Sequence, residues 1–307
     1  MSPLRLLAKH LALGILATLG VLTAVFAMFT LTDGRAAHDE TGFGPGTMTG
    51  EETVFELYLT VVWNAMTLQW GRAAGGPPNA FTYTYEAGDP VAPLVFGSLA
   101  RTAAYVIPAI AIGISIAVIF GLYVALRPES RLASVSMGSS YLLFAVPSFW
   151  VGGIALSVTL DGPVEYSPVV FEHVLPIALV TTTVLGAYVS YARAHALEYA
   201  TAEFVRLVEA KGAGPVRIAR HVLRNAAIPI VSMVFTEALG LLVLSVFVVE
   251  VLFAIEGIGL LLFGAADARD IPVLLGSVLV IVGIGVLTNA LQDLSYGVLD
   301  PRVGTSQ

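Results

Sequence analysis

The sequence predicts an all-α polytopic membrane protein with six transmembrane helices. Composition is the first observation: 57% of the 307 residues are hydrophobic and 12% are charged, whereas a soluble domain carries about 25% charged residues. The second is the length of the uncharged runs, because roughly 20 apolar residues are needed to cross a bilayer core of about 30 Å. Such runs, one of them broken only by Glu237, cover residues 11–30, 102–126, 132–160, 174–192, 226–249 and 271–292.

The absence of cysteine and the balance of charged residues limit the kinds of site that this chain can carry. The chain has no cysteine, which excludes disulfides, thiolate metal ligands and cysteine nucleophiles. Its net charge is −7, and Lys9 and Lys211 are the only lysines. This excess of acid and of arginine over lysine suits a protein from a high-salt organism and, equally, one from a GC-rich genome.

The distribution of basic residues predicts the orientation of the chain, since Lys and Arg concentrate in cytoplasmic segments next to span ends. With the N-terminus inside, eleven of the 15 basic residues fall in inner segments and the other four in outer ones. Acidic residues are frequent in the outer segments. We therefore expect both termini in the cytoplasm.

The first apolar run follows Arg5 and Lys9, as the apolar part of a signal peptide does. It is longer than a usual signal h-region, and no convincing small-x-small cleavage site follows it. We therefore expect it to stay as the first transmembrane helix. The expected division is an N-terminal helix over 1–31, an extracytoplasmic segment over 32–94, a core of five helices over 95–297 and a cytoplasmic tail over 298–307.

Two outer stretches are predicted to be helical without spanning. Residues 53–70 predict an amphipathic helix, and packing explains its apolar face more simply than ligand binding does. Its apolar residues recur at helical spacing: Val54, Leu57, Tyr58, Val61, Val62, Ala65 and Met66. The stretch 254–270 has an apolar core of about ten residues, too short to span, and predicts a surface helix or a re-entrant segment.

Motifs of common catalytic sites are missing from the sequence. There is no phosphate-binding G-x-x-x-x-G-K-[ST] loop, no H-E-x-x-H and no G-x-S-x-G. No two of the five histidines are three or four residues apart. We therefore expect no catalytic residue, no metal site and no cofactor in this chain, and nothing indicates a nucleic-acid partner.

Charged residues are concentrated in one inner segment, residues 203–229. Its sequence predicts two helices joined by a corner. In the first helix Phe204, Leu207 and Val208 share one face. Gly212 suits the left-handed conformation that ends a helix.

The second helix of this segment is predicted to begin at Pro215, because proline fits the first helical turn. Ile218 and Val222 form an apolar row in it. Basic side chains recur beside that row at i, i+3 and i+7, namely Arg217, Arg220 and Arg224.

Two interpretations of this charged segment remain open on the residues alone. A basic amphipathic helix can lie on anionic lipid, and the positive-inside bias by itself places arginines here. The alternative is docking to a cytosolic protein. The acids Glu203 and Glu209 favour docking, because anionic lipid repels them.

The segment E-F-V-R-L-V-E-A-K-G…R-H-V-L-R-N-A-A-I-P resembles the EAA motif of ABC importer permeases of the dipeptide/oligopeptide/nickel group. The resemblance extends over most of the chain. Four further stretches match motifs of that group in order: A-V-P-S-F-W at 145–150, H-V-L-P at 173–176, V-V-E-V-L-F-A-I-E-G-I-G at 248–259 and L-D-P-R at 299–302.

The sequence departs from this family at three positions. Val208 stands where the family usually has Ala, Glu256 stands where it has Pro, and Glu237 stands where a neutral polar residue is more usual.

The resemblance implies a type I ABC importer permease fold in the cell membrane. It implies that residues 195–226 form the loop through which two ABC ATPase subunits act on the permease. The implied coupling residues are Glu203, Arg206, Glu209, Ala210, Lys211, Gly212, Arg217 and Arg220. The implied partners are a second permease subunit in a heterodimer and an extracytoplasmic solute-binding protein, and ATP hydrolysis belongs to the ATPase subunits.

Candidate pathway residues lie on the third and fifth expected spans. A carboxylate at the centre of a lone membrane helix costs about 2.5–3.5 kcal/mol. We therefore expect Glu237 to face a wet cavity or a polar partner, either as part of the pathway or in an interhelical hydrogen bond, and Glu250 to serve near the outer gate. Pro108 and Pro147 are expected to interrupt their spans. Phe149 and Trp150 follow the second proline and are assigned with it to the pathway.

Di- or oligopeptides are the expected cargo, with nickel, glutathione or sugars as alternatives within the same machinery. A secondary transporter working alone is a second class, disfavoured because no matched pair of broken segments is evident. A membrane-embedded enzyme is disfavoured by the missing catalytic residues.

Overall fold

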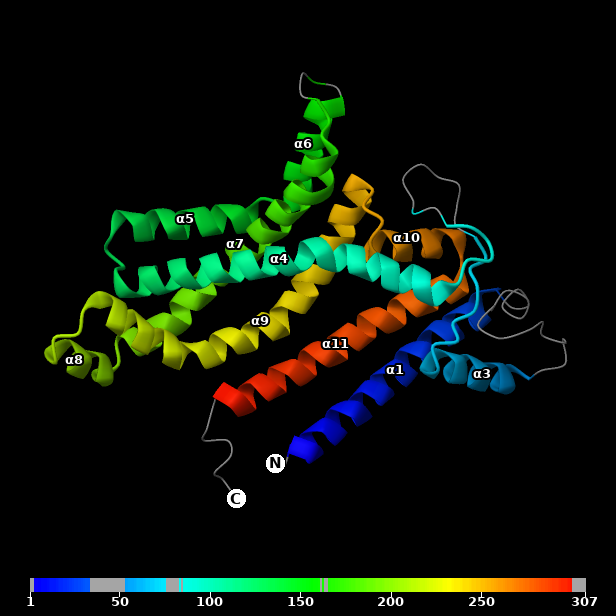
Figure 1. The fold of residues 1–307 in the computed structure, drawn as a ribbon, viewed down its shortest axis with the longest axis horizontal. Coiled ribbons are helices and arrows are strands. Elements are labelled where there is room, and N and C mark those ends of the chain that lie inside the picture. The colour runs from blue at the N-terminus through cyan, green and yellow to red at the C-terminus, as the bar shows by residue number, and fades with distance from the viewer. Residues whose placement is uncertain are drawn as a thin grey trace. The chain divides into compact units, whose positions relative to one another are not determined.

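The computed structural model describes residues 3–33, 53–75, 83, 85–160, 162 and 165–299, without the side chains of 3–11, 28–33, 57, 228, 231–245 and 296–299. Its regular elements within these residues are all helical, and one isolated β-bridge joins Arg72 to Pro90. Figure 1 shows α1 (Pro3–Asp33), α3 (Val54–Met66), α4 (Val91–Leu126), α5 (Arg131–Ala145), α6 (Ser148–Leu160), the π-helix η1 (Val169–Val174), α7 (Leu175–Ala200), α8 (Glu203–Ala210), α9 (Pro215–Phe253), α10 (Ile258–Ala268) and α11 (Ile271–Leu299).

Several of the described helices are long and apolar enough to cross a membrane. Three qualify singly: α4, η1 together with α7, and α11 over Ile271–Ser295. Two bent pairs, α5 with α6 and the end of α9 with α10, bring the number to five when each pair is taken as one span. The predicted all-α polytopic class is confirmed, and the sixth span stays a prediction because the described apolar part of α1, Ala12–Ala27, is shorter.

The third expected span is broken at Pro147, as predicted. The run from Arg131 to Leu160 forms two helices, α5 and α6, whose axes differ by 77°. Val146 caps α5 in an extended conformation, with φ −90° and ψ 116°. A residue before proline is driven out of the helical region by the proline ring, so the break follows from the local sequence.

Pro108 does not end its helix, since α4 runs from Val91 to Leu126 with this proline inside it, and the kink expected there stays a prediction. Pro229 likewise lies inside α9 without ending that helix. One proline removes a single backbone hydrogen bond, and membrane helices accommodate the freed carbonyl by small local adjustments. The remaining backbone hydrogen bonds of α4 and α9 are enough to keep each helix continuous.

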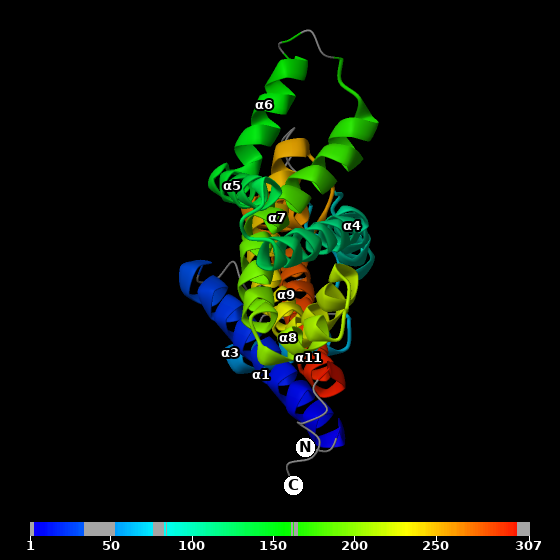
Figure 2. The same cartoon turned by 90° about the vertical axis from the view of Figure 1, so that its left-hand side faces the viewer.

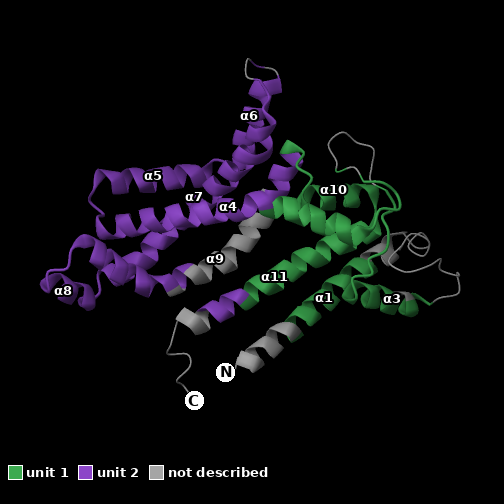
Figure 3. Ribbon diagram, in the orientation of Figure 1, with its two compact units in different colours: residues 1–103, 253–290 green, residues 104–252, 291–307 purple. Residues whose placement is uncertain are grey.

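The chain divides into two compact units, drawn in different colours in Figure 3. Unit 1 contains residues 1–103 and 253–290, and unit 2 contains residues 104–252 and 291–307. Three helices, α4, α9 and α11, contribute residues to both units.

Unit 1 is organised around the outer segment that follows α3. Trp70 is 4% exposed, stacks on Phe96 with ring centroids 5.7 Å apart and donates a hydrogen bond from Nε1 to the carbonyl of Ala65 at 3.1 Å. A Cβ atom on Gly276 of α11 would come within 2.9 Å of the Trp70 ring. Only glycine therefore permits this contact between the outer segment and α11.

A buried carboxylate also fastens the outer segment to α11. Asp270 is fully buried and accepts hydrogen bonds from the amides of Ala74 at 2.7 Å, Gly75 at 3.2 Å and Val273 at 3.2 Å. The last of these bonds caps the N-terminus of α11. Burial raises the pKa of Tyr85 above its ordinary value, and the negative charge of Asp270 acts in the same direction.

Unit 2 is built around α7, against which α5 and α6 pack; Figure 2 shows α5 beside α7. A Cβ atom on Gly186 of α7 would lie 2.7 Å from the backbone nitrogen of Phe144 in α5. A Cβ atom on Gly121 of α4 would lie 2.6 Å from the Cβ of Ala192 in α7. Glycine at these positions lets the helix backbones approach closely, as is common where membrane helices pack.

Candidate functional site

The predicted charged segment forms a bent structure of two helices, which we call the elbow (residues 203–220). Its first part is the short helix α8, and its second is the beginning of α9 at Pro215. Figure 1 shows α8 between the end of α7 and the beginning of α9. The two predicted helices are confirmed, but the second is not a separate element, because α9 continues from Pro215 to Phe253.

The corner of the elbow is closed at Gly212, as the sequence predicts. Gly212 has φ 75°, in the left-handed region that favours glycine. Its amide donates to the carbonyl of Glu209 at 2.8 Å, and the amide of Ala213 donates to the carbonyl of Val208 at 3.2 Å. These two bonds form a Schellman motif, which satisfies the last carbonyls of α8.

A small buried cluster holds the elbow in place. We call it the anchor cluster: Ala125 of α4, Ala196 of α7, Val205 of α8 and Val222 of α9, each at most 5% exposed. Phe204 and other partly buried apolar side chains pack around it. One side chain of α8 is therefore packed among the ends of three long helices.

All predicted coupling residues lie on the exposed surface of the elbow. Together with two apolar neighbours they make what we call the docking face: Glu203, Arg206, Leu207, Glu209, Ala210, Lys211, Gly212, Val216, Arg217 and Arg220. Within the described residues, none of its six charged side chains forms an ion pair or a side-chain hydrogen bond. Their charges are therefore available to a partner.

The apolar face expected for the first helix is not the one that packs. Leu207, grouped there with Phe204 and Val208, is 62% exposed, while Val205 is 4% exposed. Phe204 and Val208 are partly buried, as expected. The helix is rotated so that Val205 points into the anchor cluster, and in a helix of eight residues the apolar spacing alone does not fix that rotation.

Two exposed apolar residues of the docking face were missed by the sequence reasoning. Leu207 and Val216 are 62% and 76% exposed, and they flank the corner. Exposed apolar side chains amid charged ones are typical of protein interfaces. A surface held only by anionic lipid headgroups does not explain the acids of this face.

A groove of about 570 Å³ runs beside the elbow in unit 2. Its floor is apolar, from Ile119, Leu122 and Leu126 of α4 and Ile218 of α9. Arg127 and Glu209 add one charge of each sign to its lining. The groove lies where the end of α4 meets the elbow.

Of the two acidic pathway candidates, the structure describes the side chain of Glu250 and not that of Glu237. Glu250 is fully buried in α9 and accepts a hydrogen bond from the hydroxyl of Tyr105 in α4 at 2.9 Å. This bond links two long helices within unit 2. The side chain of Glu237 lies outside the described residues, so its role stays a prediction.

The remaining pathway candidates cluster at the break between α5 and α6. Pro147 makes the break, and Phe149 and Trp150 in the first turn of α6 are 51% and 58% exposed. Glu250 is buried elsewhere in the same unit. The coupling candidates are therefore neighbours in the elbow, and the roles of the pathway candidates stay predictions.

Comparisons with known proteins identify the family of the chain. Residues 117–305 match the family described as "Binding-protein-dependent transport system inner membrane component". The chain belongs to this family. It is thus a membrane permease subunit of an ABC importer.

Named relatives of the permease come from two bacterial groups. A dipeptide transport system permease protein of Bacillus subtilis is 26% identical over 297 residues, covering 92% of each chain. A putative peptide transport system permease protein of Brucella abortus is 29% identical over 320 residues, covering 97% of this chain and 98% of the relative. A putative peptide permease protein of Brucella ovis is 31% identical over 228 residues, covering 69% and 71%.

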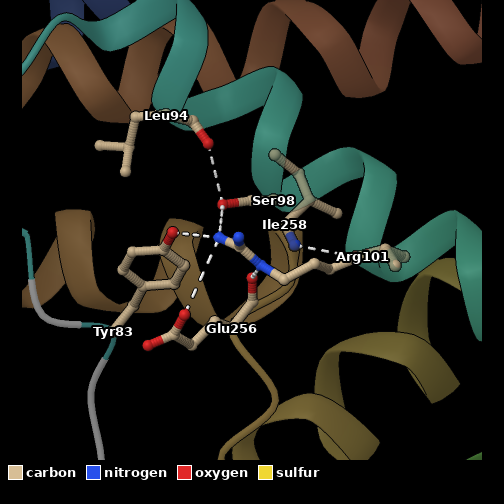
Figure 4. A network of polar contacts seen from close by, with 7 residues as sticks. Tyr83, Leu94, Ser98, Arg101, Glu256 and Ile258 are labelled. Atoms are coloured by element: carbon tan, nitrogen blue, oxygen red, sulfur yellow. Dashed lines mark hydrogen bonds and ion pairs between the residues drawn. The ribbon is translucent and has the colours of Figure 1, made fainter. Parts of the chain in front are cut away.

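The departure at Glu256 fits a polar network in unit 1 of the permease (Figure 4). Arg101 of α4 donates from Nε to the backbone carbonyl of Glu256 at 2.6 Å, and its guanidinium also donates to the Tyr83 hydroxyl. The Glu256 carboxylate is 4.0 Å from the guanidinium, with both side chains about half exposed, and such surface pairs contribute little. The hydrogen bond from Arg101 is accepted by the backbone carbonyl of residue 256, which a proline would also have. Glutamate in place of the family's proline therefore leaves this hydrogen bond intact.

Proposed function

We propose that this permease forms, with a second permease subunit, the translocation path of an ATP-driven importer, and that the docking face receives an ABC ATPase subunit. In this proposal residues 195–226 transmit the closure of two ATPase subunits to the membrane helices. The chain itself carries no ATPase site, and hydrolysis takes place on those partners.

The anchor cluster is the observation that supports this proposal most directly. Val205 of α8 is packed among α4, α7 and α9. Because buried side chains are close-packed, a push on α8 is transmitted to those helices rather than absorbed. The outer side of the same short helix presents the charged and apolar docking face.

The proposed orientation places the docking face and both termini in the cytoplasm. The excess of basic residues in the segments on that side supports it. The extracytoplasmic segment, residues 32–94, and the outer helix α10 then face a solute-binding protein. The proposed location is the inner, or cytoplasmic, membrane.

Di- or oligopeptides are the proposed cargo. The supporting observation is that the relatives named above are described as dipeptide or peptide permeases. Nickel, glutathione and sugars are the alternatives for the same machinery. A stand-alone secondary transporter leaves the exposed charges of the docking face without a role.

A charge reversal tests the coupling role. In the assembled transporter, Arg206→Glu is expected to abolish cargo-stimulated ATP hydrolysis, because a charge at the docking face then opposes its partner on the ATPase. Arg131→Glu is the matched control, since Arg131 is also an exposed arginine in unit 2 but begins α5 and lies outside the elbow. Full stimulation in the Arg206 variant overturns the docking proposal.

Competition for uptake tests the cargo separately. Membrane vesicles that hold the assembled transporter and its binding protein are expected to accumulate a labelled dipeptide when ATP is present. Unlabelled di- and tripeptides are expected to compete, while nickel, glutathione and sugars leave uptake unchanged. Competition by one of those three compounds alone overturns the peptide assignment and leaves the ATPase docking intact.

A further inference from the structure

One face of helix α3 packs against other residues of unit 1. Val61 and Ala65 are buried at 1% and 6% exposure. The Tyr58 ring packs edge-on against Phe26 of α1 with centroids 5.5 Å apart, and its hydroxyl shares a hydrogen bond with Thr23 at 2.7 Å. This face attaches α3 along the side of α1, as Figure 1 shows.

A second face of α3 is apolar, and none of the residues that the structure describes buries it. We call it the outer stripe: Phe55, Leu59, Trp63 and Met66, exposed at 67%, 49%, 67% and 50%. These positions recur at i, i+4, i+8 and i+11, so they form one continuous row along the helix. The row carries no charge and contains two aromatic side chains.

A narrow polar edge borders the outer stripe. Glu56 and Thr60 are exposed and lie one turn apart, about 100° around the helix from Phe55 and Leu59. Glu56 also closes a capping box, accepting a hydrogen bond from the Thr53 backbone amide at 2.9 Å while the Thr53 hydroxyl accepts from the Glu56 amide at 3.3 Å. The hydrogen bond from that backbone amide, with help from the Thr53 hydroxyl, lowers the pKa of Glu56. The edge therefore stays charged at neutral pH.

The position of α3 along α1 sets its depth. Tyr58 meets α1 at Thr23 and Phe26, and α1 ends at Asp33. At about 1.5 Å per residue, the contact at Phe26 lies about 10 Å from that end. The described apolar part of α1, Ala12–Ala27, also ends beside this contact. The contact therefore lies near the end of the apolar part, the level at which interfacial helices bury an apolar face about 5–10 Å into the boundary between headgroups and acyl chains.

We propose that α3 is a membrane-interface helix, with the outer stripe inserted among the lipids of the extracytoplasmic leaflet and the edge of Glu56 and Thr60 facing water. Helix α1, against which α3 packs, also exposes apolar side chains, at Leu13, Ile15 and Leu16. Aromatic residues are enriched at the level of the lipid headgroups. Lipid is the occupant that matches an uncharged aromatic row beside the end of a membrane helix.

In this placement α3 positions the outer segment relative to the membrane, a role that is separate from ATPase coupling. A helix fixed at the bilayer surface holds the start of the outer segment at constant height, and Trp70 and Asp270 then fasten the following residues to unit 1. The inference does not depend on the cargo or on ATPase docking.

Spin labels on two adjacent residues test the proposal. The chain has no cysteine, so Leu59→Cys and Thr60→Cys each give one nitroxide site on this subunit once any cysteines of its partners are replaced. The assembled transporter in phospholipid vesicles is then measured for collisions with oxygen, which concentrates in lipid, and with a water-soluble nickel chelate. The ratio of oxygen to nickel collisions is expected to be severalfold higher at position 59 than at position 60.

Two outcomes overturn the proposal. Similar ratios at both positions, with free access of nickel, mean that the stripe faces water. A label at position 59 shielded from both reagents means that a protein partner, such as the second permease subunit or the binding protein, covers the stripe. Trp63→Cys serves as a second position on the stripe if the Leu59 variant does not assemble.

Discussion

Gly212 sets the direction of the chain between α8 and α9 through one backbone angle. With φ 75°, an L-residue at this position costs roughly 1–2 kcal/mol. No neighbouring atom would crowd an added Cβ, so the whole cost arises in the backbone. Gly212→Ala is expected to speed amide hydrogen exchange over residues 208–214 by about 5- to 30-fold.

Gly214→Ala is the control for this prediction. Gly214 also has free space around a Cβ, and its φ lies outside the left-handed region. Hydrogen exchange measured by mass spectrometry should stay near the wild-type rate in this variant. Equal protection in both variants would show that the corner does not need glycine.

The Tyr105–Glu250 hydrogen bond is the second prediction at the scale of single residues. Tyr105→Phe removes the 2.9 Å donor while keeping the ring in place. Losing a partner of a fully buried carboxyl group costs roughly 1–3 kcal/mol. Thermal unfolding of the purified transporter should therefore shift to lower temperature, whereas Tyr141→Phe, at a side chain 59% exposed, should leave it unchanged.

Packing between whole elements depends on α7, and Gly186 is the position at which it is tested. Gly186→Ala places a Cβ 2.7 Å from the α5 backbone at Phe144, and overpacking of this kind costs roughly 1–3 kcal/mol. We expect a lower thermal midpoint for the transporter. Backbone atoms cannot move aside as a flexible side chain can, so α5 and α7 must separate.

Gly138→Ala in α5 provides the matched comparison for Gly186. An added Cβ there meets nothing within 4 Å, and alanine in a helix interior is favoured over glycine by roughly 0.5–1 kcal/mol. This variant should be as stable as the wild type or more stable. The packing account fails if both substitutions have the same effect.

The helices themselves were largely predictable, and their breaks only in part. Pro147 ends α5 as expected, because the restriction on Val146 is local. Pro108 and Pro229 carry the same local signal but stay inside helices, since surrounding contacts decide whether a freed carbonyl is tolerated. The capping box of Thr53 and Glu56 was readable as T-x-x-E and was missed.

The rotation of short helices was the least predictable feature. Leu207 was grouped on one apolar face with Phe204 and Val208, yet it is exposed while Val205 is buried, because two turns of apolar residues fit more than one face. In α3, two apolar faces share one helix, and the structure shows which one packs through the burial of Val61 and Ala65 and the contact of Tyr58 with α1. Burial of this kind depends on residues distant in the sequence, which periodicity does not reveal.

At the scale of the whole molecule, we propose that the elbow is the point where the ABC ATPase subunits act on the permease. Charge distribution predicted the side on which the elbow lies, and motif resemblance predicted its partner. The family match over residues 117–305 covers the elbow together with all four residues of the anchor cluster. Neither sequence nor fold supplies the partner itself, because its surface belongs to another chain.

Site-specific cross-linking of the elbow tests this central claim most directly. Lys211→Cys, exposed at the corner of a chain without cysteine, is labelled with benzophenone maleimide in the assembled transporter, and Glu86→Cys in the outer segment is the control. The account predicts a photo-cross-link from position 211 to an ATPase subunit and none from position 86. An unlinked position 211, or one labelled only from the extracytoplasmic side, would contradict it.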